Sequence, residues 1–449
     1  MCPQRNISAF VTGRRIDDRP VAGRLFFLIA QVGTVLMERP LNERYDAIVV
    51  GARCSGAATA MLLARRGMSV LLFDRDRHGA DTLSTLALMR AGVLQLHRWG
   101  LLEQVRAAGT PPVRATRFVY GDEVITIPIK PRNGVDAFYS PRRTVLDPLL
   151  ADAAAAAGAD VRYGPRLSDL LRGPNGRVSG VVLEDRAGSL HEVRAGLVIG
   201  ADGIRSTVAR KVEAETYREG KFAAGVVYGF WRGLENHGNR WHYRPGVSAG
   251  AIPTNDDNTC VFATVPSARF RDEMQRDMEG GYHRVLSECA PDLAREVSAA
   301  VLSERFRGFP GQAGYMRRSA GPGWALVGDA GYFKDPITAH GISDALRDAE
   351  LLARAVERGS DQALAEYQST RDDLSRELFE ITDAIAGFEW DLEVLQPLHR
   401  DLSRNMNLEV EALLGLDQPE GQPVAGKPSR STEGGRPPPE LSVRRPDSR

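Results

Sequence analysis

The sequence contains little cysteine, little lysine and no long apolar run. Its four cysteines are scattered through 449 residues without a CxxC pair, which excludes a disulfide scaffold and a zinc ribbon and is typical of a reducing, cytoplasmic location. Only five of the 58 basic residues are lysine, which we attribute to the codon usage of a GC-rich genome. No run reaches the roughly 18 apolar residues of a membrane-spanning helix, so we expect no stable membrane insertion.

The charges of the chain balance. The 58 Lys and Arg residues are matched by 58 Asp and Glu residues, so no overall field attracts the protein to nucleic acid. Hydrophobic residues make up 43% and charged residues 26%, the composition of a globular protein. We therefore expect a small-molecule substrate and no nucleic acid, and we leave monomer and homodimer open. The isolated histidines show no metal-ligand spacing, so we expect no metal site.

The two ends differ in composition from the rest of the chain. Residues 1–44 are an N-terminal extension that we expect to be poorly ordered. The apolar run Leu25–Met37 follows an arginine pair, as in a twin-arginine signal, but no small-residue cleavage site follows it. We favour an upstream extension, with Met37 as an alternative start. Residues 417–449 are predicted to be a disordered tail, because they hold too little apolar surface to offset the entropy of ordering.

A glycine-rich turn lies between two predicted strands near the start of the body. Tyr45–Val50 is a short apolar run that predicts a buried parallel strand, and it ends in the turn Gly51–Gly56. An alanine-rich helix is predicted over Ala57–Arg66 and a second strand over Ser69–Phe73, which is followed by Asp74. A strand, a glycine turn, a helix, a strand and an acid at this spacing are typical of a dinucleotide-binding unit.

The residue types in this turn suit a pyrophosphate. Gly51 permits a tight turn, Gly56 lets the helix pack against the strand, and the helix N-terminus offers free N–H groups and a partial positive charge. Asp74 can accept hydrogen bonds from both hydroxyls of an adenosine ribose, and it disfavours a 2′-phosphate. Arg53 replaces the usual middle glycine, so its side chain either points away from the turn or bends back to a phosphate.

Two further strand ends carry an aspartate beside a glycine. Leu197–Gly203 and Trp324–Ala330 are apolar strands that end in Asp202-Gly203 and Gly328-Asp329, and the second is followed by a predicted helix over Ile342–Arg358. The carboxyl ends of strands are where α/β sheets bind ligands. For a single aspartate, a helix cap is the better explanation, but three acidic strand ends indicate one long ligand held at several points.

These three ordered motifs resemble the single-component FAD-dependent monooxygenases of the para-hydroxybenzoate hydroxylase type, whose relatives include geranylgeranyl reductases and flavin halogenases. The resemblance spans roughly Tyr45–Ala355. It implies an α/β fold, with a Rossmann-like FAD-binding domain, a mixed or antiparallel β-sheet substrate domain and C-terminal helices. We assign residues 45–115, 141–216 and 306–358 to the FAD-binding domain. Residues 116–140 and 217–305 are assigned to the substrate-binding sheet, and residues 359–416 to the C-terminal helices.

The resemblance also implies a set of flavin contacts. Asp74 would hold the adenosine ribose, Asp202 would lie near the pyrophosphate, and Asp329 would bind the ribityl chain or pyrophosphate. Arg143 is similar to the arginine that opens the family's helix beside the flavin. The full expected FAD-binding set is Gly51, Arg53, Cys54, Ser55, Gly56, Asp74, Arg75, Arg143, Asp202, Gly203, Gly328, Asp329, Gly341 and Ile342.

Two residues are catalytic candidates in this scheme. Pro336 would lie under the isoalloxazine. His340 falls where the flavin is expected, and with an ordinary pKa near 6.5 it either relays protons or hydrogen-bonds the flavin. The alternative, equally weighted, is a packed or capping histidine at the start of a helix.

The implied reaction is a monooxygenation. NADH or NADPH would reduce FAD, O2 would form a flavin C4a-hydroperoxide, and oxygen would pass to an aromatic or polycyclic small molecule by hydroxylation or epoxidation. The sequence has no second glycine-rich unit for a dedicated NAD(P)H domain, so this co-substrate is expected to dock transiently. The alternatives are an FAD-dependent dehydrogenase or reductase of carbon–carbon double bonds, like the geranylgeranyl reductases, and a flavin-binding protein without turnover. Halogenation is disfavoured because Ser248–Pro253 lacks both tryptophans of the halogenase motif.

The substrate side of the chain is predicted from aromatic strands. Trp231, Trp241, Tyr243 and Phe262 alternate with polar residues in these strands, so we expect some of them to line a pocket and others to fill the core. The predicted strands are Phe222–Trp231, Arg240–Tyr243, Ser248–Ile252 and Thr259–Val265, with a further piece of the sheet in Arg117–Ile129.

Overall fold

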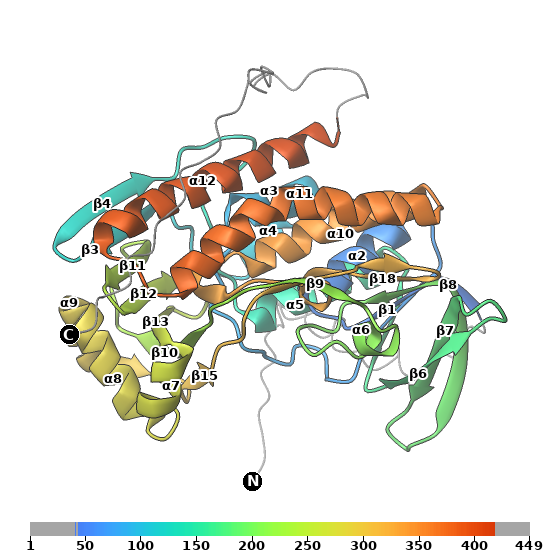
Figure 1. Ribbon diagram of the computed structural model, residues 1–449, viewed down its shortest axis with the longest axis horizontal. Helices are drawn as coiled ribbons and strands as arrows, with labels where there is room; N and C mark the ends of the chain where they lie inside the picture. Colours follow the sequence, from blue (N-terminus) through green and yellow to red (C-terminus); the bar gives the residue numbers. More distant parts are fainter. Residues whose placement is uncertain (1–40, 42–43, 418–449) are drawn as a thin grey trace, which may run out of the picture.

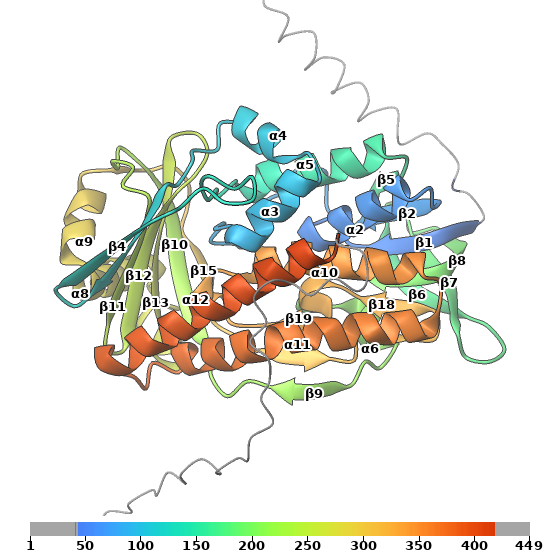
Figure 2. The same ribbon diagram turned by 90° about the horizontal axis from the view of Figure 1, so that it is seen from above.

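Two eight-stranded sheets lie at opposite ends of the molecule, with long helices running between them (Figures 1 and 2). The computed structural model describes residue 41 and residues 44–417. The predicted disordered tail beyond Asp417, the apolar run Leu25–Met37 and nearly all of the N-terminal extension lie outside the described residues.

The first sheet is built on parallel strands. Its main order is β17-β18-β8-β1-β2-β5, in which β1 pairs in parallel with both β2 and β8, and β18 pairs in parallel with β8. β1 is buried along most of its length, as expected of a central parallel strand covered on both faces. The strands of this sheet are β1 (Arg44–Val50), β2 (Val70–Asp74), β5 (Asp160–Tyr163), β6 (Arg166–Arg172), β7 (Val178–Glu184), β8 (Leu190–Gly200), β17 (Ala320–Gly321) and β18 (Trp324–Leu326).

The second sheet is mostly antiparallel, and only the β3–β11 pair is parallel among its described pairs. Its order is β14-β10-β13-β12-β11-β3-β4, with β15 also paired to β10. The predicted aromatic strands are all present, each shifted by one or two residues at its ends. The strands of this sheet are β3 (Ala115–Tyr120), β4 (Glu123–Pro128), β10 (Ala224–Arg232), β11 (Asn239–Arg244), β12 (Val247–Pro253), β13 (Asn258–Pro266), β14 (Val301–Leu302) and β15 (Arg307–Phe309).

A small third sheet and the helices complete the fold. The third sheet joins β9 (Thr216–Glu219), β16 (Tyr315–Arg317) and β19 (Tyr332–Phe333). The α-helices are α2 (Cys54–Arg65), α3 (Arg90–Arg98), α4 (Leu102–Ala107), α5 (Arg143–Ala156), α6 (Thr207–Lys211), α7 (Ser267–Glu273), α8 (Met278–Cys289), α9 (Pro291–Ser298), α10 (Gly341–Glu357), α11 (Asp361–Ala386) and α12 (Leu392–Gly415). Two short 3-10 helices are η1 (Gly328–Ala330) and η2 (Pro336–Thr338). No helix among the described residues is long and apolar enough to cross a membrane.

The helices bury the parallel sheet and connect it to the second sheet. α2, α5 and α10 pack with β1 and β2 in one apolar core, whose members include Met61, Leu150 and Leu346. α12 runs across both halves of the molecule (Figure 2). Leu395, near its start, belongs to the core of the second sheet, whereas Leu413, near its end, belongs to the core around α2 and α10.

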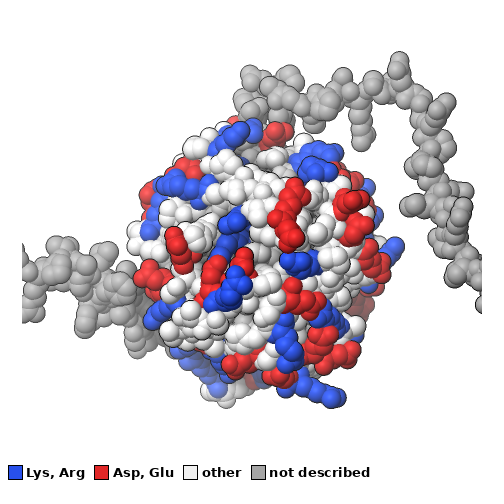
Figure 3. Space-filling view, turned by 90° about the vertical axis from the view of Figure 1, so that its left-hand side faces the viewer, with Lys and Arg blue, Asp and Glu red and all other residues white. Residues whose placement is uncertain are grey.

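Charges of both signs are interspersed on the face of the molecule drawn in Figure 3, which is the left-hand side of Figure 1. Of the described side chains visible there, the basic and acidic ones are mixed and form no large patch of one sign. Such a face offers no continuous basic track for a polyanion.

Candidate functional site

The three glycine-containing motifs converge at the carboxyl edge of the parallel sheet. A Cβ placed on Gly51 would lie 2.5 Å from the carbonyl oxygen of Ala201, the residue before Asp202. A Cβ on Gly328 would lie 2.9 Å from the Cβ of Ser55. The β1–β8 and β8–β18 pairings produce these approaches, because they align the ends of three neighbouring strands.

The first turn of α2 leaves backbone donors free. No side chain caps α2 at Arg53, and its first turn contains no acid. Gly56 is held so close to β1 that a Cβ there would lie 1.9 Å from the carbonyl oxygen of Gly51. An uncapped helix start brought against a strand end in this way provides N–H groups and a positive dipole for an anionic ligand.

Asp74 and Arg53 flank this turn. One carboxylate oxygen of Asp74 accepts the N–H of Ala52 at 2.8 Å, so the acid also fixes the turn itself. Arg53 pairs with Asp76 at 2.9 Å and with Asp147 at 3.3 Å. The side chain of Arg53 is therefore engaged by carboxylates, which is the first of the two orientations expected from the sequence.

Asp147 connects α5 to α2, a role that the sequence analysis did not predict. Arg143 makes a two-point ion pair with Asp147, through contacts of 2.9 and 3.0 Å. The thiol of Cys54 donates to the same carboxylate at 3.0 Å. Burial raises the pKa of Cys54 well above its ordinary value, so this thiol is neutral at physiological pH. The only sequence signal was the spacing of four residues between Arg143 and Asp147, which places them on one helix face.

Asp202 is a helix cap in the structure. Its carboxylate accepts the hydroxyl of Ser206 at 2.5 Å and the backbone N–H groups of Thr207 and Val208, which begin α6. Asp202 therefore helps to cap α6, whose N-cap residue is Ser206, and its expected place near the pyrophosphate stays a prediction. Gly203, next in the chain, has a φ of +76° and open space where a side chain would project.

Asp329 carries a carboxylate for which the structure shows no hydrogen bond or ion pair with any described residue. It lies in η1, beside the first turn of α2, and its backbone oxygen accepts the hydroxyl of Tyr315. Burial raises the pKa of Asp329 to about 6, although the nearby guanidinium of Arg143 lowers it. An unpartnered, desolvated carboxylate at a strand end is placed to accept hydrogen bonds from a ligand.

The start of α10 forms the other side of the site. No side chain caps α10, and a Cβ on Gly341 would meet no atom within 4 Å. Ile342 is half-buried against the core around α2. Arg75 is exposed after β2.

A cavity lies beside Pro336, between η2 and the second sheet. Trp241 and Phe262 line it, whereas Trp231 and Tyr243 pack elsewhere in the core. Asp335 is the one ionisable side chain in its lining. Burial raises the pKa of Asp335 to about 7, while the N–H groups of Ala224 and Ile337, which it accepts, lower it. The remaining lining residues are Thr85, Ala224, Val226, Thr264 and Ile337.

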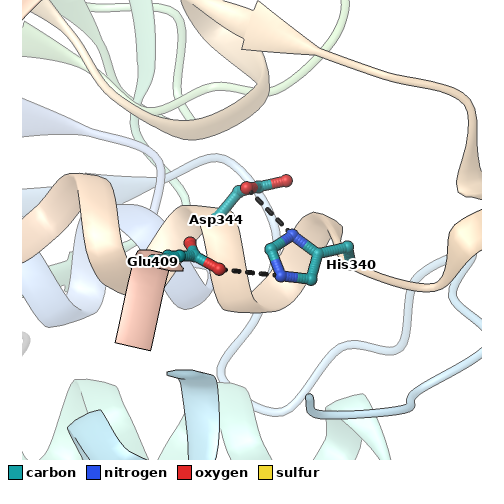
Figure 4. A group of neighbouring side chains, drawn as sticks. All are labelled: His340, Asp344 and Glu409. Carbon is teal, nitrogen blue, oxygen red and sulfur yellow. Dashed lines mark hydrogen bonds and ion pairs between the residues drawn. The ribbon is translucent and has the colours of Figure 1, made fainter. Parts of the chain in front are cut away.

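His340 is a packed histidine in this structure. Its side chain is 0% exposed, and its two ring nitrogens lie 3.1 Å from Asp344 and 2.9 Å from Glu409 (Figure 4). The ring therefore faces two carboxylates instead of the cavity beside Pro336. Ligand atoms of these three residues lie within 4.8 Å of one another, as in a metal site. However, the ammonium of Lys334 lies 3.0 Å from Nδ1 of His340 and supplies the positive charge there.

A family model for an FAD binding domain matches residues 44–382. The chain belongs to this FAD-binding family. It is a flavin-dependent oxidoreductase, and the resemblance to flavoprotein monooxygenases and their reductase and halogenase relatives is confirmed at the level of the family. The residues present suit FAD: an uncapped helix start at a glycine turn, open space at Gly203 and Gly341, and the unpartnered carboxylate of Asp329.

Sequence relatives of this flavoprotein include two kinds of reductase. Digeranylgeranylglycerophospholipid reductase 2 of Methanococcoides burtonii is 27% identical over 376 residues, which cover 73% of this chain and 80% of that protein. The menaquinone reductase of Mycolicibacterium smegmatis is 27% identical over 355 residues, which cover 75% of this chain and 81% of that protein.

Solved structures show the same fold. The flavin-dependent brominase Bmp2 matches with a TM-score of 0.69 at 20% identity, covering 83% of this chain and 99% of that one. PqsL of P. aeruginosa, in complex with 2-aminobenzoylacetate, matches with a TM-score of 0.69 at 23% identity, covering 80% and 100%. Identities this low establish the architecture and leave the reaction to be argued from the site.

Proposed function

We propose that this flavoprotein is a monooxygenase that uses NADH or NADPH and O2 to hydroxylate or epoxidise a compact aromatic or polycyclic molecule. The observation that carries the proposal is the cavity beside Pro336. Two of its lining residues, Pro336 and Ile337, belong to η2, which precedes α10 in the chain, and the lining is apolar and aromatic apart from Asp335 and two threonines. Side chains of this kind bind a ring system by burial of apolar surface.

The cavity is small in this structure. Its internal space is about 10 Å³, which is room for about one water molecule, so any substrate requires movement of the lining. A ring system the size of a substituted phenol or a quinoline requires a smaller rearrangement than a prenyl chain of twenty carbons. Trp241 and Phe262 pack against one another, with ring centroids 5.5 Å apart, and form one wall.

Different residues of the chain would hold different parts of the cofactor. We assign the pyrophosphate to the first turn of α2 and the polar ribityl chain to Asp329. Arg143, fixed by Asp147, supplies a positive charge near these groups. Bound FAD supplies acceptance of hydride and activation of oxygen. The start of α10, uncapped and open at Gly341, directs a partial positive charge at whatever lies against it, which stabilises negative charge there.

A second candidate function is the reduction of carbon–carbon double bonds in an isoprenoid lipid. Its support is the similarity to reductases of prenylated phospholipid and menaquinone over about three quarters of the chain. It shares the flavin site with the first candidate and differs in the substrate and in the fate of O2.

One experiment separates the two candidates. The purified holoprotein is mixed with NADH or NADPH, and O2 consumption is followed across phenols, quinolines, polyketides and prenyl lipids. Substrate-dependent O2 uptake, with ¹⁸O from labelled O2 in the product, is the expected result. Saturation of an alkene under anaerobic conditions supports the reductase instead. Oxidation of the reductant at a rate that no compound alters contradicts both candidates.

A further inference from the structure

α12 crosses the boundary between the two large cores, and one buried side chain attaches it to α10. Leu395 and Leu402 pack in the core of the second sheet, whereas Val410 and Leu413 pack in the core around α2 and α10. Glu409 lies between these two groups of contacts and is 0% exposed at its side chain. It reaches His340, which immediately precedes the first residue of α10.

The geometry around His340 places a carboxylate oxygen beside each ring nitrogen. Nδ1 lies 3.1 Å from Oδ1 of Asp344, and Nε2 lies 2.9 Å from Oε2 of Glu409 (Figure 4). An ionised carboxylate only accepts hydrogen bonds, and a neutral imidazole donates through only one nitrogen. Two simultaneous contacts with ionised carboxylates therefore favour the imidazolium form, in competition with a neutral ring whose Nδ1 accepts from the ammonium of Lys334.

The charge balance of the buried cluster favours the same form. The groups that face His340 are Lys334 from the segment before η2, Asp344, Arg347 and Asp348 from α10, and Glu409 from α12. Lys334 and Arg347 supply two positive charges against three carboxylates, so an imidazolium makes the cluster neutral. Arg347 is bound to Asp348 at 2.7 Å and to Glu409 at 2.9 Å. The neighbouring Arg371 is already balanced by Asp372.

The pKa shifts of His340 and Glu409 agree with this charge balance. Burial lowers the pKa of His340, but the carboxylates of Glu409 and Asp344 outweigh it and hold the pKa above 6.5. Burial raises the pKa of Glu409, but His340 and Arg347 outweigh that effect and hold the pKa below 4.5. Both shifts favour the charged forms of the two partners.

We infer that His340 is a positioning residue, held as an imidazolium between Asp344 and Glu409, which fixes the start of α10 and locks α12 across both halves of the molecule. When the ring loses its proton, one of its two contacts becomes repulsive between lone pairs, and a net negative charge is left buried. The lock is complete below the ordinary pKa of histidine, and it weakens as the pH rises towards the raised pKa of His340. This inference does not depend on which reaction the flavin performs.

The first test measures the protonation state of the His340 ring by NMR. The full-length holoprotein is labelled with ¹⁵N-histidine, and His340→Gln identifies the ring signals of His340. At pH 7 we expect both ring nitrogens to show the chemical shifts of a protonated imidazolium. A neutral ring whose Nδ1 accepts from Lys334, 3.0 Å away, overturns the inference.

The second test measures how firmly α12 is held as the pH changes. Native-state hydrogen exchange of α12, corrected for intrinsic exchange, measures its opening equilibrium between pH 6 and pH 9. Above about pH 6.5 we expect opening to rise up to tenfold per pH unit until the pKa of His340 is passed. Glu409→Gln should raise opening at pH 6.5 and flatten this dependence. The matched control is Glu411→Gln, which removes a half-exposed charge of the same helix, 3.9 Å from Arg132, and should keep the wild-type slope. Equal slopes in wild type and Glu409→Gln refute the lock even if His340→Gln fails to fold.

Discussion

Replacing Asp329 with asparagine should stabilise the flavin-free protein while weakening its affinity for FAD. Burial raises the pKa of this carboxyl from 3.8 to about 6, so the folded protein holds its proton more tightly than the unfolded chain does. The penalty for ionising Asp329 appears as the pH rises from about 4 to 6, and it remains in full at neutral pH. Two pKa units correspond to about 3 kcal/mol, which is an upper limit because the residue retains some solvent contact.

At pH 7.5 we therefore expect Asp329→Asn to raise the free energy of unfolding of the apoprotein by about 1–3 kcal/mol. The gain should disappear near pH 4, where the wild-type carboxyl is protonated as well. Differential scanning fluorimetry of flavin-free protein at several pH values measures this. FAD should bind about 10- to 150-fold more weakly, because a hydrogen bond to a charged group contributes about 1.5–3 kcal/mol. Quenching of flavin fluorescence measures the dissociation constant.

Asp202→Asn is the matched control. Its carboxylate is also buried at a strand end, but it accepts three hydrogen bonds at the start of α6. Because asparagine caps a helix about as well as aspartate does, this substitution should change stability by no more than about 0.5 kcal/mol. If the apoprotein of Asp329→Asn is no more stable than wild type and binds FAD with unchanged affinity, then Asp329 is neither desolvated nor a ligand, and the placement of the flavin at this edge is refuted.

The remaining predictions concern glycines, thiols and the cavity. Gly56→Ala should abolish FAD binding and destabilise the fold, because the new Cβ would lie 1.9 Å from a backbone oxygen. Gly341→Ala faces open space, so it should leave apoprotein stability within about 0.5 kcal/mol and weaken only FAD binding. Equal effects of the two substitutions on thermal unfolding would contradict the assigned positions. Three cysteines are buried: Cys54, Cys260 and Cys289. Burial raises the pKa of the last two to about 12, so we expect none of the three to react with DTNB at pH 8 in the native protein. If peptide mapping finds any of them modified before unfolding, the packing described here is wrong. Trp241→Ala should cost about 3–5 kcal/mol and extend turnover to bulkier substrates, and an unchanged substrate range would show that the reaction occurs elsewhere.

The flavin-binding half of the molecule was largely predictable from local sequence. The strand over Tyr45–Val50, the glycine turn after it and the acid at Asp74 form one continuous unit, and each step follows from short-range preferences for strand, turn and helix. The parallel pairing of β1, β2 and β8 then brings the motifs to one edge, which is a general property of such sheets.

Tertiary structure alone decided which side chains meet. Cys54 and Asp147 are 93 positions apart, and neither local sequence predicts their contact. The same holds for His340, whose partner Glu409 arrives on α12, and for the choice of Trp241 and Phe262 over Trp231 and Tyr243 as walls of the cavity. Local sequence was enough to predict the elements and the chemistry at the strand ends, because backbone geometry and hydrophobic periodicity act over a few residues. The ion network, the capping role of Asp202 and the shape of the cavity depend on packing between distant segments, and they exist only once the helices have closed over the sheets.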